Sequence, residues 1–231
     1  MRALISALFT SIILLAPACL PTTSNNFESA RMLPPKAVEV QGTGALYFGK
    51  LDNRNEPSWA HRTNNYGIAV AYGISSKLRG RFRFDQIILK DRAELTSGPV
   101  LPVGSRVHYS ELSLKYGWNQ RKANTFAAVS LPIGLISYKG GSIWTLAPTV
   151  YATYFKNDKF EIGMNGKLHF WLQGPPHYPW FSFGIGAGFS NNLNRWAIRP
   201  EIGYDLFNIS AGLGFSYIFL SDNPKIQANP R

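Results

Sequence analysis

Apolar side chains recur at every second position along most of this chain, from about Lys36 to Leu220. The run from Phe160 to Leu172 shows the pattern most clearly. One face carries Phe160, Ile162, Met164, Leu168, Phe170 and Leu172, and the other carries Glu161, Asn165, Lys167 and His169. A repeat of two residues is that of a β-strand, whose side chains point alternately to opposite faces. The pattern therefore predicts strands with one apolar and one polar face.

Ten such runs follow one another and predict ten strands. They cover residues 37–49, 66–74, 78–88, 107–118, 125–138, 143–155, 160–172, 180–190, 195–206 and 208–220. A tilted strand needs about 9–11 residues to cross the hydrocarbon core of a membrane, and most of these runs are that long. Pro132 and Pro148 predict local irregularities, because proline has no N–H to donate to a neighbouring strand. We expect an all-β fold, a closed antiparallel up-and-down transmembrane β-barrel of about ten strands, with eight to twelve possible.

The connections between the predicted strands alternate in length. Residues 50–65 and 89–106 are long and rich in asparagine, proline and charge, whereas residues 155–159 and 191–194 are brief. Long loops at one rim and tight turns at the other are typical of outer-membrane barrels. Both ends of the barrel are then expected at the short-turn, periplasmic rim.

The polar faces carry charges of both signs, which we expect to line the lumen. The candidates are Arg79, Arg81, Arg83, Asp85, Glu111, Lys115, Glu161, Lys167, Arg195, Arg199, Glu201 and Asp205. Counted with Glu39, they are nearly balanced in sign, which predicts an ionic network because an unpaired buried charge is costly. Aromatic residues near the predicted strand ends, among them Trp118, Trp180 and Trp196, predict girdles at the two lipid interfaces.

The N-terminal residues have the features of a secretory signal peptide. Arg2 supplies the positive start, residues 3–16 the apolar stretch, and Ala16-Pro17-Ala18 a small-x-small cleavage site. The single cysteine, Cys19, follows directly. Residues 14–19 resemble the lipobox of bacterial lipoproteins, and this resemblance implies lipid attachment at Cys19. Plain cleavage that leaves a free thiol is the alternative.

These signals divide the chain into four parts. We expect a signal peptide at 1–18, a tether and periplasmic lead-in at 19–35, the β-barrel at 36–220 and a C-terminal tail at 221–231. Within the lead-in, residues 28–33 predict a short helix that Pro34 and Pro35 end. Such a helix could tuck under the barrel.

Composition narrows the class of protein. Of 231 residues, 45% are hydrophobic, which excludes a disordered chain. After the leader no apolar stretch approaches 18 residues, so an ordinary helical membrane protein is also excluded. The net charge of +11 lies largely in predicted loops, through residues such as Lys139 and Lys159. There the expected partners are anionic lipid headgroups and lipopolysaccharide rather than nucleic acid.

The last predicted strand carries a further signal. Residues 212–219, a glycine followed by alternating aromatic residues, resemble the C-terminal insertion signal of outer-membrane barrels. Together with the leader and the strands, they make the chain resemble small bacterial outer-membrane β-barrel proteins over nearly its whole mature length. The resemblance implies an outer-membrane location and insertion by the barrel-assembly machinery.

A barrel of this size has an interior that side chains largely fill, so free passage of large solutes is not expected. A narrow ion path along Arg79, Arg81 and Arg83 would favour anions if the arginines were incompletely paired. The other interpretation is a structural salt-bridge plug. We expect a non-enzymatic protein with a structural, surface or narrow porin-like role.

Two further hypotheses stay open. His108 and Ser110 share one strand face, and His-x-Ser on a barrel strand resembles the lipid A deacylases, which implies a lipid-modifying enzyme. Such an enzyme also needs a carboxylate to orient the histidine, but Glu111 lies on the opposite face and the next acidic residue is Asp158. The other hypothesis is a soluble lipocalin-like lipoprotein that binds an apolar ligand.

No spacing of histidine and cysteine predicts a metal site, and no motif predicts a cofactor. The pattern does not determine an oligomeric state.

Overall fold

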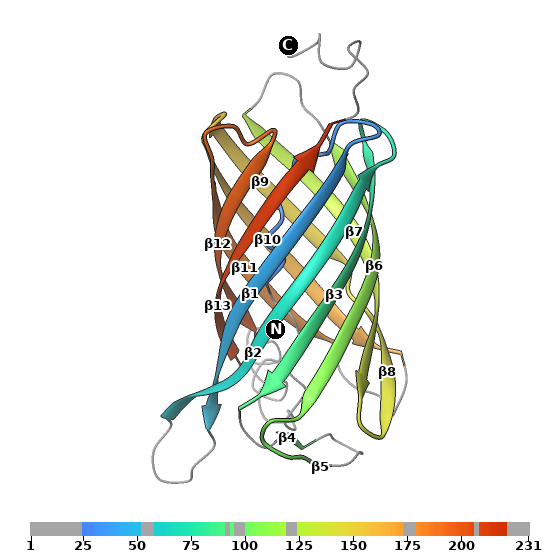
Figure 1. Ribbon diagram of the computed structural model, residues 1–231, viewed down its shortest axis with the longest axis vertical. Helices are drawn as coiled ribbons and strands as arrows, with labels where there is room; N and C mark the ends of the chain where they lie inside the picture. Colours follow the sequence, from blue (N-terminus) through green and yellow to red (C-terminus); the bar gives the residue numbers. More distant parts are fainter. Residues whose placement is uncertain are drawn as a thin grey trace, which may run out of the picture.

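The computed structural model describes residues 25–51, 58–90, 93–94, 100–118, 124–172, 179–205 and 208–220. They form a barrel of tilted antiparallel strands (Figure 1). The strands are β1 (Val38–Leu51), β2 (Ser58–Gly73), β3 (Leu78–Leu89), β4 (Ala93–Glu94), β5 (Val100–Leu101), β6 (Arg106–Trp118), β7 (Thr125–Tyr138), β8 (Gly141–Leu146), β9 (Thr149–Asn157), β10 (Phe160–Trp171), β11 (Trp180–Phe189), β12 (Trp196–Asp205) and β13 (Asn208–Phe219). The predicted signal peptide, Cys19 and the predicted C-terminal tail lie outside the described residues.

The sheet closes because the last strand pairs with the first. β13 runs antiparallel to β1 from Val38↔Phe219 to Gly49↔Asn208, and the other barrel strands pair with their neighbours along the chain. β8 and β9 share one crossing of the wall, since β8 pairs with residues 133–138 of β7 and β9 with residues 125–130. The eleven strands of this sheet therefore make ten crossings. The expected all-β, up-and-down barrel of about ten strands is confirmed.

The break between β8 and β9 falls at Ala147 and Pro148, where the sequence predicted an irregularity within one strand. The Ala147 N–H donates to the carbonyl oxygen of Pro132 at 3.0 Å, and the Pro148 carbonyl accepts from the Leu168 N–H at 3.0 Å. Pro148 interrupts the ladder because it has no N–H, but its neighbours hold the segment in the wall.

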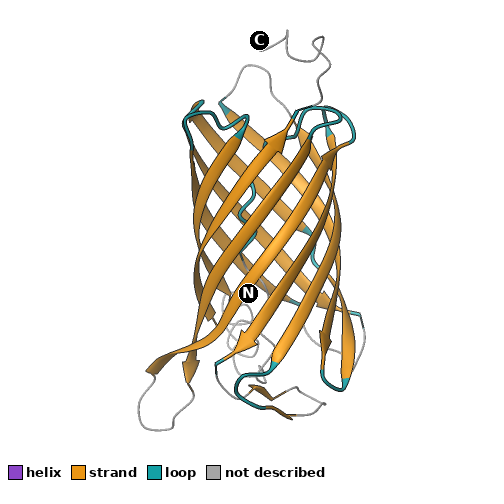
Figure 2. Ribbon diagram, in the orientation of Figure 1, coloured by secondary structure: helices purple, strands orange, loops and turns teal. Residues whose placement is uncertain are grey.

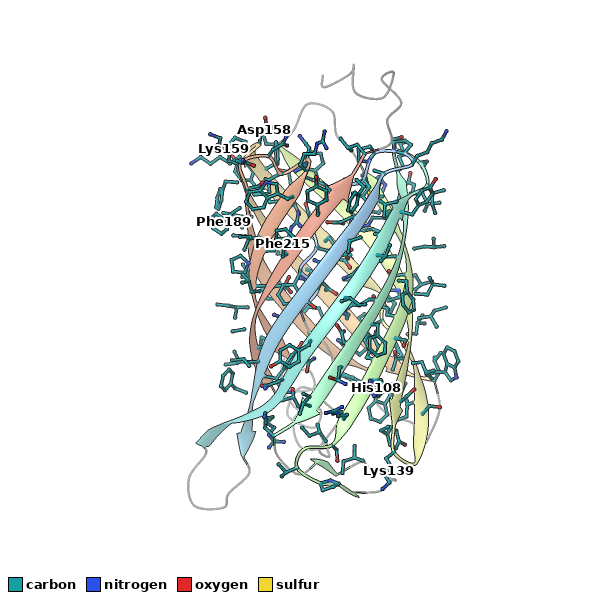
Figure 3. All side chains as sticks on the ribbon, viewed as in Figure 1. His108, Lys139, Asp158, Lys159, Phe189 and Phe215 are labelled. Carbon is teal, nitrogen blue, oxygen red and sulfur yellow. The ribbon has the colours of Figure 1, made fainter. Side chains whose placement is uncertain are left out.

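The two faces of the strands are sharply different. Apolar side chains project outward around the barrel, as Phe189 and Phe215 do in Figure 3. The exposed apolar residues include Ile68, Val70, Phe82, Leu112, Leu114, Leu131, Ile133, Val150, Met164, Ile185, Ile202 and Leu213. The charged residues on the opposite face are buried inside the barrel. The predicted alternation thus places its apolar face on the outside.

An apolar exterior around a charged interior is the inverse of a water-soluble protein, whose charged groups face water. In lipid every backbone polar group must be satisfied within the protein, and a closed barrel achieves this without a free edge. The molecule is therefore a transmembrane β-barrel, and it belongs in the outer membrane of a bacterium, where such barrels occur. The soluble lipocalin-like hypothesis required residues such as Leu114 to meet inside, whereas Leu114 is 55% exposed.

The two rims differ, but the long loop expected at residues 50–65 is shorter, because β1 ends at Leu51 and β2 already begins at Ser58. The turn at residues 139–140, between β7 and β8, is also tight although it lies at the rim of the long loops. β1 begins and β13 ends at one rim, together with the short turns at residues 74–77, 158–159 and 190–195. The opposite rim carries the connection from β3 to β6, which includes the two-residue strands β4 and β5. In outer-membrane barrels the rim with both ends of the barrel chain is periplasmic, and the opposite rim is extracellular.

The helix predicted over residues 28–33 is not formed. These residues are irregular and extended, and they run inside the barrel rather than beneath it (Figure 2). A helix this short is costly to nucleate, and the Ala30 N–H donates to Thr153 of the barrel wall instead. Among the described residues no helix is long and apolar enough to cross a membrane.

Candidate functional site

The lumen is occupied by the residues that precede β1. Residues 25–35, named here the luminal segment, run inside the barrel toward the periplasmic rim, where the chain turns into β1 (Figure 2). Asn25 is fully buried, and Asn26 and Phe27 are each 1% exposed. The part of the chain expected to be a periplasmic lead-in is therefore, from Asn25 onward, an internal plug.

The backbone N–H groups of the luminal segment bind acceptors on one side of the wall. Asn26 and Phe27 donate to the two carboxylate oxygens of Glu201, at 2.8 and 2.7 Å. The Ala30 N–H donates to Oγ1 of Thr153 at 2.7 Å. Glu201 is buried on β12, so these hydrogen bonds stabilise a carboxylate charge that water does not reach.

The carbonyl oxygens of the same segment bind donors on the other side of the wall. Arg83 Nη1 donates to the Asn25 carbonyl at 2.8 Å, Gln41 Nε2 to that of Phe27 at 2.6 Å, and Lys115 Nζ to that of Ser29 at 2.6 Å. The segment is thus held through its main chain from both sides. This satisfies buried backbone groups that have no strand partner.

Glu28 places its carboxylate among three cations of the wall. Its oxygens lie 3.0 Å from Arg79 Nη2, 3.5 Å from Arg81 Nη1 and 3.7 Å from Lys115 Nζ. The hydroxyl of Tyr151 also donates to Glu28 at 2.9 Å. Three ion pairs and one hydrogen bond therefore compensate the burial of this carboxylate.

Phe27 seats the segment against β1 and β13. It packs with Ala45 and Tyr47, and the backbone of Gly212 and Gly214 leaves the space for its ring. Its backbone φ of 53° lies in the left-handed region, which is unfavourable for a residue with a bulky side chain. The contacts of Phe27 therefore hold its own backbone in a strained conformation.

The periplasmic end of the lumen is closed by Arg31 and Leu33. Arg31 donates to Asn194 in the turn before β12, lies 3.6 Å from Glu161 and stacks its guanidinium 4.5 Å from the ring centre of Phe155. Leu33 packs with apolar residues of the wall. A cavity of about 100 Å³ remains beside them, lined in part by Arg79, Arg199 and Glu39.

The extracellular end is closed by apolar side chains that face inward. One buried cluster consists of Ile87, Leu89, Val107, Tyr109 and Ile136. Leu101 of β5 packs onto this cluster from the extracellular loop. On the side of the cluster that faces the centre of the lumen, the Tyr109 hydroxyl donates to Glu111 at 2.7 Å. The lumen thus has an apolar cover at one end and an ionic plug at its centre.

Eleven of the twelve residues expected to line the lumen are buried inside the barrel. They are Arg79, Arg81, Arg83, Asp85, Glu111, Lys115, Glu161, Lys167, Arg199, Glu201 and Asp205. The exception is Arg195, which is exposed in the periplasmic turn before β12. The placement of Arg195 in the lumen was wrong because β12 begins one residue later, at Trp196, and the turn frees the arginine to face solvent.

Most luminal cations also have a carboxylate partner on the wall itself. Arg83 Nε lies 2.7 Å from Asp85, Arg79 Nη2 lies 2.7 Å from Glu39, and Arg199 Nη2 lies 3.0 Å from Glu161. Glu28, the residue that joins the segment to this network, was missed. The alternation of strand faces carries no information about a residue outside the strands.

His108 and Ser110 both face outward, near the extracellular rim, where Figure 3 labels His108. The His108 ring stacks on Phe84 of β3, with ring centres 5.6 Å apart. Its Nδ1 is buried and has no hydrogen-bond partner among the described residues. The carboxylate that would orient this histidine is therefore not brought to it by the described part of the chain.

A second histidine, His169, lies inside the barrel. Its Nε2 is 2.8 Å from the Ser182 hydroxyl, and its ring stacks on Trp180 with ring centres 5.1 Å apart. Trp180 was expected in an interfacial girdle but is buried in the lumen, because it begins β11 on the inward face. The described residues contain no group of three histidine, cysteine or acidic residues that could hold a metal ion.

No protein-family model matches this chain, and no curated protein sequence matches it. Solved structures with a similar trace include the NanC porin, at 12% identity, covering 77% of this chain and 98% of that one, with a TM-score of 0.48. They also include the outer membrane protease OmpT from Escherichia coli, at 8% identity, covering 84% and 100%, with a TM-score of 0.48. The outer membrane protein OprG from Pseudomonas aeruginosa matches at 9% identity, covering 84% and 100%, with a TM-score of 0.40. The membrane assignment rests on the outward apolar face and inward charges of this chain.

Proposed function

We propose that this outer-membrane barrel is a non-enzymatic, narrow porin-like protein whose lumen is closed by its own luminal segment. The observation that carries the proposal is the position of Glu28 between Arg79, Arg81 and Lys115. This carboxylate occupies the cationic side of the lumen, where a permeating anion would otherwise bind.

Removal of the segment would leave a polar path of limited width from the periplasmic rim to the apolar cluster at the extracellular end, and conduction requires that this cluster also opens. The space that the segment occupies is that of one extended polypeptide chain, bordered by Arg81 and Lys115 on one side and by Glu161 and Glu201 on the other. Small hydrophilic solutes fit such a path and large ones do not. Anions gain most, because Arg79, Arg81 and Lys115 then lose the Glu28 carboxylate.

The non-enzymatic part of the proposal is supported by the surroundings of His108. Nucleophilic catalysis by Ser110 needs a histidine that a third group holds in the right tautomer. His108 instead stacks on Phe84, and its Nδ1 has no partner among the described residues. A deacylase-like enzyme is therefore the less supported alternative.

Conductance in planar bilayers tests the proposal with a matched pair of variants. Glu28→Gln removes the carboxylate from the segment, whereas Glu39→Gln removes one from the wall that also contacts Arg79. We expect the wild-type protein and Glu39→Gln to be closed most of the time and Glu28→Gln to open more often, with a preference for anions. Equal silence of all three proteins would overturn the porin-like role and leave a structural one.

We also propose that the rims contact charged lipid. Lys90 and Lys139 are exposed at the extracellular rim, where lipopolysaccharide phosphates lie, and Lys156 and Lys159 are exposed at the periplasmic rim (Figure 3 labels Lys139 and Lys159). The outward aromatic residues of β13 support recognition by the barrel-assembly machinery.

A further inference from the structure

We propose that the lumen is a binding site for extended peptides that carry an aromatic residue followed by an acidic one. In this structure the protein's own Phe27 and Glu28 occupy the site. The inference rests on the proposed function in one respect, which is that the luminal segment must be able to leave the lumen.

Side chains of the barrel wall hydrogen-bond to the main chain of the luminal segment. Five strands each contribute one side chain to backbone groups of the segment: Gln41 from β1, Arg83 from β3, Lys115 from β6, Thr153 from β9 and Glu201 from β12. Main-chain hydrogen bonds give affinity for peptides of many sequences. No lipid or sugar offers N–H donors and carbonyl acceptors at this alternating spacing.

Two adjacent subsites of the lumen select the side chains of a bound peptide. The first, formed by Ala45, Tyr47, Gly212 and Gly214, accepts an aromatic ring. The second, formed by Arg79, Arg81, Lys115 and Tyr151, accepts a carboxylate. Adjacent subsites of different chemistry define a short sequence, aromatic then acidic, rather than a single charge.

An empty lumen would leave buried charges of the wall poorly paired. Glu201 accepts two hydrogen bonds from the segment at 2.7 and 2.8 Å, and from the wall it accepts one at 3.4 Å, from Asn165. Lys115 binds Ser29 and Glu28 of the segment and otherwise lies over the Tyr151 ring. Buried charges without partners are costly, so the lumen favours an occupant that supplies both a carboxylate and N–H donors.

The tether itself makes the segment an imperfect ligand. Lys36, at the turn into β1, has a φ of 66°. It is a non-glycine residue in the left-handed region, which is strained. A separate peptide that makes the same contacts does not have to meet the turn into β1, so it can compete with the segment.

Fluorescence anisotropy of a labelled peptide in detergent micelles tests the proposal on the full chain. The peptide has the sequence of residues 25–33, Asn-Asn-Phe-Glu-Ser-Ala-Arg-Met-Leu. The protein is the Phe27→Ala, Glu28→Gln double variant, in which the tethered segment has lost both side-chain contacts. Heat-modifiable migration on gels verifies that it is folded, and Glu28→Gln alone replaces it if it is not.

We expect saturable binding by the variant and much weaker binding by the wild-type protein. A peptide with glutamine in place of its glutamate should bind about tenfold or more weakly, since it loses a charge-assisted contact. Glu201→Gln in the variant background should weaken binding of the original peptide. Binding that is absent, or equal for the glutamate, glutamine and scrambled peptides, would overturn the inference. Conductance is not needed for this readout, so a barrel that never conducts can still bind the peptide.

Discussion

Phe27 of the luminal segment packs so closely on Gly214 of β13 that a Cβ atom added at Gly214 would lie 2.8 Å from the Cβ of Phe27. The last strand of the barrel therefore has to lack a side chain where the first described residues of the chain pass by. This contact couples closure of the barrel to closure of its lumen, because β13 also pairs with β1.

Gly214→Ala should displace Phe27 and destabilise the plugged barrel. Overpacking of a filled interior costs about 1–3 kcal/mol. Gly42→Ala is the matched control, because it adds the same methyl group to β1 with no atom within 4 Å. Urea unfolding in lipid vesicles should show a lower midpoint for Gly214→Ala and an unchanged or higher one for Gly42→Ala. Equal midpoints would show that Phe27 does not occupy this seat.

The outward apolar face makes a second prediction, about depth in the membrane. Leu112, at the centre of β6, is 65% exposed, and Trp118 ends the same strand. Arginine on the lipid face costs about 2–4 kcal/mol at the membrane midplane and about 0–1 kcal/mol near the interface. Leu112→Arg should therefore lower the unfolding free energy in vesicles by more than Trp118→Arg does. Similar losses at both positions would contradict the assigned depth.

The proposed lack of enzyme activity is tested on lipid A. Expression of the wild-type protein and of Ser110→Ala in a host with intact lipopolysaccharide should give lipid A of identical mass, because His108 stacks on Phe84 and its Nδ1 has no hydrogen-bond partner among the described residues. Mass spectrometry measures the result. Loss of an acyl chain with the wild-type protein but not with Ser110→Ala would establish a deacylase.

Lipid attachment at Cys19 stays a prediction, and the position of Asn25 constrains it. Asn25 follows Cys19 by six residue steps along the chain, which gives a reach of at most about 20 Å. Asn25 contacts Tyr47, nine residues along β1 from its periplasmic start at Val38, which is about 30 Å along the strand. Because barrel strands tilt by about 35–45°, this is roughly 21–25 Å of depth, so Cys19 can lie near the periplasmic rim only at the full reach of the tether while Asn25 stays in the lumen.

Metabolic labelling with palmitate tests this prediction. We expect label in the wild-type protein and none in Cys19→Ser. An unlabelled wild-type protein would show that Cys19 is not acylated.

The amino-acid sequence alone determined that about ten strands cross the wall and which residues of each share a face. Leu112 and Leu114 alternate with Glu111 and Lys115 whatever the surroundings, because the side chains of any strand alternate between its two faces. Even a local defect was predictable, since Pro148 cannot donate to the ladder wherever it lies. These features depend on local backbone geometry, which neighbouring residues encode.

Only the tertiary structure decided what fills the lumen. Residues 28–33 have the local character of a short helix, yet they are extended because Thr153 and Lys115 bind their backbone groups and Glu201 binds the N–H of Phe27 just before them. Those partners come from strands far away in the sequence and meet only when the barrel closes. Trp180 and Arg195 were misplaced for a related reason, because the residues where strands begin depend on pairing with their neighbours. Contacts between distant segments arise when the sheet closes. The alternation of apolar and polar residues within one strand does not predict them.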